Sequence, residues 1–154
     1  MGRIVLVALG VLIAFLALRY LGSAEYQIRS SIERAAHEAE EERIEGVMSE
    51  VSAAFRGFGG AQAGLESSLR QSVVEGGWSS ISLVTIDVTL VSETEADAIV
   101  CASFRGNKAS EQRAGFEGLY EASISFRKEN DGKWRADEAG ATMIQAEPAM
   151  KPCR

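Results

Sequence analysis

The hydrophobic period of the sequence changes near residue 80, and this change limits the fold more than any other feature. Before it, apolar side chains recur every three or four residues; from Ile81 onward they alternate with polar ones. Three segments alternate in this way, and a fourth follows Asn130-Asp131-Gly132, a turn typical of a β-hairpin. Strands joined this closely form an antiparallel sheet with one apolar and one polar face. The pattern predicts an α+β domain with about four strands.

Three helices are predicted ahead of the sheet. A long one covers residues 28–39, where isoleucine and alanine recur at helical spacing among glutamate and arginine. A short one follows over residues 44–51 with its apolar face re-phased, and residues 55–60 form a turn. Leucine and valine then recur every four residues from 65 to 73, and two glycines at 76–77 end this third helix.

The N-terminus is predicted to enter a membrane. Residues 4–18 carry no charge, and the apolar span to residue 21 makes a helix of roughly 27 Å, about the thickness of a hydrocarbon core. We favour an uncleaved transmembrane anchor because the run is long for a secretory signal and Arg19 and Tyr20 suit the interface. A secretory signal is the alternative, since Arg3 supplies a basic start and residues 22–24 are small.

We therefore expect residues 1–24 to be an anchor, or uncleaved signal, with a short linker. Residues 25–145 would form the folded domain, and residues 146–154, which hold both prolines, a loose tail.

The orientation of this span is open to two interpretations. Arg19, Arg29 and Arg34 follow it, and a count of basic residues places the domain in the cytoplasm. A three-residue N-terminal tail before a signal-like segment usually stays inside and sends the rest across. We favour a single-pass protein of the inner (cell) membrane with a periplasmic or external domain.

The charge balance argues against nucleic acid as a partner. The chain carries a net charge of −6, and because residues 1–24 contribute +2, the rest carries −8. No basic stripe with interleaved aromatic residues occurs, and an acidic domain repels phosphate backbones.

The two cysteines, Cys101 and Cys153, are too few for a zinc knuckle. The favoured interpretation is a buried free thiol at Cys101 and an unrelated cysteine in the tail. The alternative is a disulfide that joins the tail to a strand, which requires an oxidising compartment.

The order of these elements resembles the nuclear-transport-factor-2-like (NTF2-like) superfamily. The resemblance rests on IRSSIERAAHEAEEERIEGVMSEVS, on FRGFGG, on the DVTL strand and on the FRKENDGKWRADE hairpin, and it covers Ile28 to Gly140. It implies a cone, in which helices close a strongly curved sheet around a pocket. The superfamily contains isomerases, dehydratases and other enzymes, but also non-catalytic binding and assembly domains, some of them membrane-anchored, so fold alone does not select a function.

The sheet face expected to pack on the helices carries almost no titratable group, whereas the family's enzymes place theirs there. The candidates for lining the pocket are large and mostly apolar: Phe55, Phe58, Trp78, Val84, Ile86, Phe104, Tyr120, Ile124 and Trp134.

The opposite face would meet solvent or a partner, and its small and charged residues are the candidates for an interaction surface: Thr85, Asp87, Thr89, Ser103, Glu121, Ser123, Ser125 and Arg127. A phase error of one residue would turn Asp87 and Glu121 inward and revive an enzymatic interpretation.

No catalytic, metal or cofactor site is predicted. His37 is the only histidine, so the glutamates around it lack the second histidine of a metallohydrolase helix. GFGGAQAG has no Gly-Lys-Ser/Thr ending and follows a helix, unlike a phosphate-binding loop, and no G-x-S-x-G elbow occurs.

Two functions remain. The first is a non-enzymatic membrane protein whose domain is an interaction or accessory subunit, either paired with itself or bound to other membrane-protein subunits. The second is a domain that binds, or less readily converts, a small apolar ligand in the cone.

Overall fold

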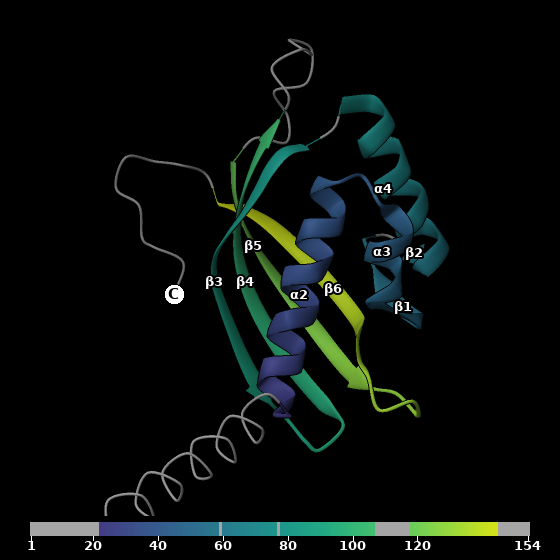
Figure 1. The fold of residues 1–154 in the computed structure, drawn as a ribbon, viewed down its shortest axis with the longest axis vertical. Coiled ribbons are helices and arrows are strands. Elements are labelled where there is room, and N and C mark those ends of the chain that lie inside the picture. Colours follow the sequence, from purple (N-terminus) through teal and green to yellow (C-terminus); the bar gives the residue numbers. More distant parts are fainter. Residues whose placement is uncertain (1–21, 59, 77, 107–117, 145–154) are drawn as a thin grey trace, which may run out of the picture.

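The computed structural model describes residues 22–58, 60–76, 78–106 and 118–144, and these form an α+β domain with a curved six-stranded sheet (Figure 1). The described helices are α2 (Ala24–Glu40), α3 (Ile44–Ser49) and α4 (Gln62–Gly76). The strands are β1 (Val51–Gly57), β2 (Gly60–Ala61), β3 (Trp78–Leu90), β4 (Glu95–Gly106), β5 (Gly118–Lys128) and β6 (Trp134–Ile144). The predicted α+β class with a curved sheet is confirmed, and a helix occurs at each of the three places predicted within the domain.

Helix α2 begins where Ser23 caps it, because the Ser23 hydroxyl accepts a hydrogen bond from the Tyr26 backbone N–H at 3.2 Å. Its buried residues include Ile28 and Ile32, which lie one turn apart and face the sheet. Figure 1 shows α2 lying across one face of the sheet, called the inner face below, with α3, α4 and β1 beside β6.

The strand order is β2-β1-β6-β5-β4-β3, so the predicted count of about four strands is wrong. The antiparallel sequence from β3 to β6 is as predicted, but β1 adds to β6 in parallel, with Val51 opposite Ala136 and Gly57 opposite Ala139. The sequence gives no sign of β1 because its buried positions, Val51, Ser52 and Phe55, do not alternate. Residues expected to end a helix and form a turn therefore form a strand.

A β-bulge in β3 corrects the predicted phase of that strand. Leu83 lies opposite Ala102 and Thr85 opposite Cys101, so Val84 is an extra residue with no partner in β4. Val84 consequently faces outward with 58% of its surface exposed, and Leu90 at the strand end is 53% exposed. The inward residues are Ile81 and Leu83 before the bulge and Ile86 and Val88 after it.

The core lies between α2 and the inner face of the sheet. Ile28 and Ile32 of α2 meet a cluster of buried sheet residues: Ile86, Ala96, Ala98, Val100, Ala102, Phe126 and Trp134. Full burial of each larger side chain is worth about 1.5–3 kcal/mol, so this layer holds the helix on the sheet.

Helix α2 also covers the exposed edge of the sheet, which is strand β3. Arg29 donates through Nη2 to the Ile86 carbonyl at 2.7 Å, and the Ile81 N–H donates to Glu40 Oε1 at 2.5 Å. Side chains at the two ends of the helix thus bond with backbone groups that an edge strand leaves free to pair with another chain.

No helix within the described ranges is both long and apolar enough to span a bilayer. The predicted anchor, residues 4–21, and the predicted loose tail, residues 146–154, lie outside those ranges, so both stay predictions.

Candidate functional site

An apolar cavity of about 160 Å³ lies between α2, β1, α4 and the inner face of the sheet. Its walls are mainly aliphatic and aromatic, with a polar patch at one side. The lining residues are Ser31, Ile32, Ala35, Glu50, Val51, Phe55, Phe58, Leu65, Ile124, Phe126, Ala136 and Ala139.

Small residues leave this space open where α2 passes over β6. Ala35 on the helix and Ala136 and Ala139 on β6 contribute only a methyl group each. Strand β1 closes the cavity, and it can approach β6 because residue 57 is glycine: a Cβ there would lie 2.3 Å from the Ala139 carbonyl oxygen. Phe55, which is 2% exposed, then fills the wall below this contact.

The carboxylate of Glu50 forms the polar end of the cavity. Its Oε2 accepts hydrogen bonds from the Ser31 hydroxyl at 2.6 Å and from Arg34 Nη2 at 3.2 Å, and its Oε1 accepts from Arg34 Nε at 2.9 Å. Partial burial raises the pKa of Glu50, but the hydrogen bonds from Arg34 and Ser31 outweigh it and hold that pKa below 4.5. Glu50 is therefore a charged, fixed acceptor at neutral pH.

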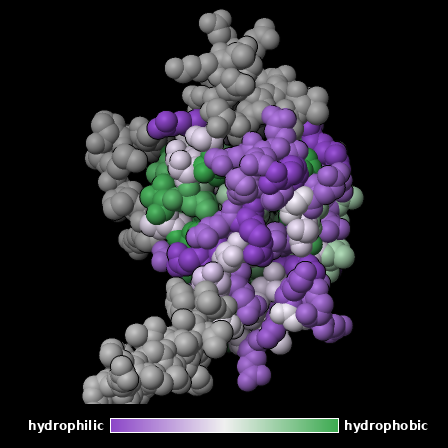
Figure 2. Space-filling model, viewed as in Figure 1, coloured by the Kyte–Doolittle hydropathy of each residue, from purple (hydrophilic) through white to green (hydrophobic). Residues whose placement is uncertain are grey.

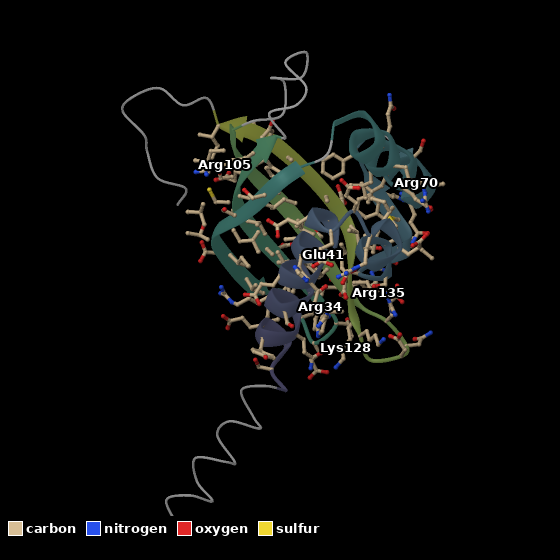
Figure 3. The ribbon with its side chains drawn as sticks, turned by 45° about the horizontal axis from the view of Figure 1, so that its top comes forward. Arg34, Glu41, Arg70, Arg105, Lys128 and Arg135 are labelled. Atoms are coloured by element: carbon tan, nitrogen blue, oxygen red, sulfur yellow. The ribbon has the colours of Figure 1, made fainter. Side chains whose placement is uncertain are left out.

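A larger polar cleft of about 680 Å³ meets the cavity at Glu50 and Val51, which line both. Arg34 and Arg135 lie at this cleft, and Figure 3 shows them near each other between α2 and β6. Arg135 is already paired, since it donates to Asp131 at 2.7 and 3.1 Å and also to Glu129. Figure 2 shows that the surface over the helices is mainly hydrophilic.

The structure brings together some of the predicted pocket residues. Phe55, Phe58 and Ile124 line the cavity, whereas Trp134 lines the polar cleft and Ile86 belongs to the closed core. Phe104 and Tyr120 lie next to each other on β4 and β5, with ring centroids 5.3 Å apart in an edge-to-face pair, and neither lines the cavity.

Two pocket candidates differ from the prediction. Val84 lies on the outer face because of the β3 bulge, so it lines no pocket. The backbone of Trp78 is described as the start of β3, but its side chain lies outside what the structure describes.

The predicted interaction residues share the outer face of the sheet, which is the face opposite α2. Register pairs Thr85 with Cys101 and Cys101 with Glu121, and Asp87 with Ile99 and Ile99 with Ser123. Asp87 and Glu121 therefore point outward, as predicted. The remaining candidates on this face are Thr89, Ser103, Ser125 and Arg127.

Sequence reasoning missed Ser31, Arg34 and Glu50. A signal for Ser31 was available, because it lies within one turn of Ile28 and Ala35 on the apolar side of α2, and a buried hydroxyl there needs a partner. That partner, Glu50, is nineteen positions away, and no local sequence pattern indicates that the two residues are in contact.

Cys101 is not a free thiol, because it is disulfide-bonded. The predicted free thiol is therefore wrong, although its predicted burial is correct. The sequence contains one other cysteine, Cys153, which lies outside the described residues.

His37 is exposed, and its Nε2 lies 3.3 Å from the carboxylate of Glu41, the residue that follows the end of α2. Among the described residues, no group of three or more histidine, cysteine, aspartate and glutamate side chains could hold a metal ion.

No protein-family model matches the sequence, and no curated protein matches it. Solved structures do. An NTF2-like protein with a cystatin-like fold from Novosphingobium aromaticivorans is 18% identical with a TM-score of 0.63, and the match covers 88% of this chain and 91% of that one. A ketosteroid isomerase-like protein from Erwinia carotovora atroseptica is 15% identical with a TM-score of 0.62, covering 81% and 99%.

Bd1075 of Bdellovibrio bacteriovorus matches with a TM-score of 0.65 at 10% identity. That match covers 78% of this chain and 40% of the longer Bd1075 chain, so this protein spans less than half of that one. Identities this low show the fold alone. The described domain has the NTF2-like fold, which ketosteroid isomerase-like proteins share.

Proposed function

We propose that the domain binds a small, largely apolar molecule that carries one hydrogen-bond donor. The observation that carries this proposal is the apolar cavity of about 160 Å³ with the Glu50 carboxylate at one end. A dry apolar cavity of about 150 Å³ holds a benzene molecule, so the ligand class is a molecule with a single ring or a short branched chain.

Glu50 gives this site its preference for a donor. A carboxylate offers about four acceptor positions, and Ser31 and Arg34 occupy three of them. A ligand hydroxyl or amine can take the remaining one. Leaving a charged acceptor against a purely apolar ligand costs free energy, so a ligand that carries a donor binds more tightly than one that does not.

We propose binding and not catalysis, because the charge of Glu50 is held by its partners. Its pKa lies below the ordinary 4.5, whereas a general base works best with a pKa near the operating pH. Phe55, Phe58 and Ile124 supply shape and apolar contact around the ligand.

Phenol and toluene test the site, since both have one ring and only phenol has a donor. We expect both to bind the full-length chain in mild detergent, with phenol tighter by roughly tenfold, as for a charge-assisted hydrogen bond. Ligand-observed NMR titration measures both constants. In Glu50→Gln the preference for phenol should fall to about twofold.

Ala35→Leu tests whether the cavity is the binding site. The added side chain fills space beside Ile32, so binding of both probes should be lost while the fold is kept. Ala36→Leu is the matched control: it makes the same change one position along α2, outside the cavity lining, and should leave binding intact. Binding that survives Ala35→Leu, or no binding of either probe to the unmodified chain, contradicts the proposal.

A second proposal concerns where the domain acts. We propose that residues 4–21 anchor it in the inner membrane with the domain on the external side, and that the outer face contacts another membrane-protein subunit or a second copy. The exposed Ile99 and Val84 support a contact surface, because they place apolar area among small polar residues of that face. An alkaline wash of membranes should leave the full chain in the pellet, and a chain lacking residues 1–21 should be released. Release of the full chain contradicts the anchor.

A further inference from the structure

The carboxylate of Glu50 lies between the apolar cavity and the polar cleft. Ser31, which bonds it at 2.6 Å, lines the cavity, whereas Arg34, which bonds it at 2.9 and 3.2 Å, lines the cleft. Only 17% of the Glu50 side chain is exposed, and Val51 is the one other described residue that lines both spaces. A molecule that fills the cavity and reaches Glu50 therefore arrives at the inner end of the cleft.

The cleft offers room and polar partners beyond this point. Its volume is about 680 Å³, against about 160 Å³ for the cavity. Gln27 and Ser30 of α2 form one wall, and the β5–β6 hairpin contributes Lys133 and Arg135 to the other. Amide, hydroxyl and charged groups of this kind lose free energy against an apolar ligand, so the part of a ligand that enters the cleft has to be polar.

Lys133 carries the positive charge of the cleft that has no partner in an ion pair. The other charged groups of the cleft and its rim are paired with one another: Arg34 with Glu50, and Arg135 with Glu129 and Asp131. The Lys133 side chain is exposed and forms no ion pair with a carboxylate among the residues that the structure describes. It is therefore available to an anionic group of a ligand.

Lys133 also lies close enough to Glu50 for the two charges to act on each other. Partial burial raises the pKa of Glu50, the hydrogen bonds from Arg34 and Ser31 lower it, and the positive charge of Lys133 lowers it further. A ligand group bonded to Glu50 and a second group near Lys133 can thus belong to one small molecule.

We propose that the cavity and the cleft form one elongated site for an amphipathic carboxylic acid. Its apolar head, a single ring or a short branched chain, fills the cavity, and an N–H or O–H donor bonds Glu50. A polar chain of a few atoms then brings the carboxylate to Lys133. This inference rests on the ligand-binding function proposed above and adds the class of the ligand's second end.

The ring and the donor supply most of the affinity at this site, and Lys133 selects the tail. An ion pair with an exposed lysine is weak because water screens it, so the carboxylate should improve binding by only about threefold. Added salt should reduce this gain further, since it screens exposed charges.

Two probes isolate the effect of the tail charge. N-benzylsuccinamate and N-benzylsuccinamide share the ring, the amide N–H and the length, and they differ only in a terminal carboxylate or primary amide. Ligand-observed NMR titration of the full-length chain in a mild non-ionic detergent at low salt measures both constants. We expect both probes to displace phenol, and N-benzylsuccinamate to bind about threefold more tightly.

Lys133→Gln should remove this preference and leave the binding of N-benzylsuccinamide unchanged, which also shows that the variant is folded. Lys128→Gln is the matched control, because Lys128 is an exposed lysine of the same hairpin that does not line the cleft. The preference should survive in that variant. A preference that survives Lys133→Gln as well overturns the inference.

Ala35→Leu tests whether the two spaces act as one site. It fills the cavity, so it should abolish the binding of both probes as it abolishes that of phenol. Binding of N-benzylsuccinamate that persists in Ala35→Leu would make the cleft a separate site and overturn the inference. If phenol binds the unchanged chain but the two probes bind it equally, the elongated site is wrong and the proposed function stands. If phenol does not bind either, both are wrong.

Discussion

The two faces of the sheet are built from alternate residues of the same strands, yet they differ in what they contribute. On β4, Val100 and Ala102 are buried against α2, whereas the outer-face positions Asp97, Ile99 and Ser103 keep contact with water. The inner face holds the domain together and contains the cavity. The exposed residues of the outer face contribute little to the free energy of unfolding, so they are available for contacts with another protein. A substitution on the inner face should therefore lower the free energy of unfolding. The same substitution one position along the strand, on the outer face, should instead affect only the binding of a partner.

The largest expected effect lies at the inner wall. Phe55→Ala removes a ring that is 2% exposed, and it should lower the free energy of unfolding by about 3–5 kcal/mol. Equilibrium denaturation by urea measures this. Phe58→Ala is the matched control, because Phe58 is 54% exposed although it also lines the cavity, and it should cost less than about 1 kcal/mol. Equal losses in the two variants would show that the β1 wall is not packed as described.

Val100 and Ile99 compare the two faces within one strand. Val100→Ala deletes two buried methyl groups and should cost about 2 kcal/mol. Ile99→Ala deletes more carbon but from an exposed position, and should cost less than about 0.5 kcal/mol. The midpoints of two urea titrations give the difference. A larger loss for Ile99→Ala would mean that the outer face around Ile99 is packed in the folded chain and not exposed to water.

This contrast also explains how much of the fold could be predicted. Alternation of apolar and polar residues was enough to predict which residues of β4 and β5 face inward and that Asp87 and Glu121 face outward. In a strand without a bulge, successive side chains point to opposite faces, so the apolar residues identify the inner face. Alternation predicted the wrong face for Val84, because the bulge inserts one extra residue and no residue type in this stretch of sequence indicates it. It failed for β1 because the burial of that strand depends on its pairing with β6, some eighty residues away.

The site was harder to predict than the fold for the same reason. Phe55, Phe58 and Ile124 could be selected as pocket residues because large apolar side chains near a turn and on an inner face suggest a lining. Glu50 could not, since its role comes from Ser31 and Arg34 on another helix. Contacts that join distant segments define the polar end of the cavity, and a single sequence carries no local trace of them.

Glu50 tests the boundary between the apolar cavity and the polar cleft. Glu50→Gln should lower the free energy of unfolding by about 1 kcal/mol at neutral pH, because a half-buried acceptor loses its charge-assisted bonds to Ser31 and Arg34. Glu45→Gln is the control: Glu45 is exposed and pairs with Arg70 at 3.4 Å, so its loss should be smaller than about 0.5 kcal/mol.

The pH dependence of this variant follows from the sign of the shift. The folded pKa of Glu50 lies below 4.5, so its contribution is complete above that value and disappears as the pH falls through the lower, folded value. The difference between Glu50→Gln and the unchanged chain should shrink under acid. A difference that grows as the pH falls below 4.5 would mean that the pKa is raised and Glu50 is poised as a base.

The smallest expected effect lies at the exposed hairpin beside the cleft. Hydrogen bonds from Arg135, and then the Lys133 backbone N–H, lower the pKa of Asp131 from 3.8 to about 2. The ionised form is favoured by folding, so its contribution is present above pH 3.8 and is lost as the pH falls toward 2. An NMR titration of the Asp131 carboxyl should give a midpoint near 2 in the unchanged chain. In Arg135→Gln the midpoint should rise toward 3.8 without reaching it, because the hydrogen bond from the Lys133 backbone N–H remains. Asp131→Asn should lower the thermal midpoint slightly at neutral pH. The effect should be smaller at pH 2, because about half of Asp131 is then protonated in the folded chain and nearly all of it in the unfolded chain. A midpoint near 3.8 in the unchanged chain would show that water screens the Arg135 pair, and that the cleft, unlike the cavity, does not fix the charges along its rim.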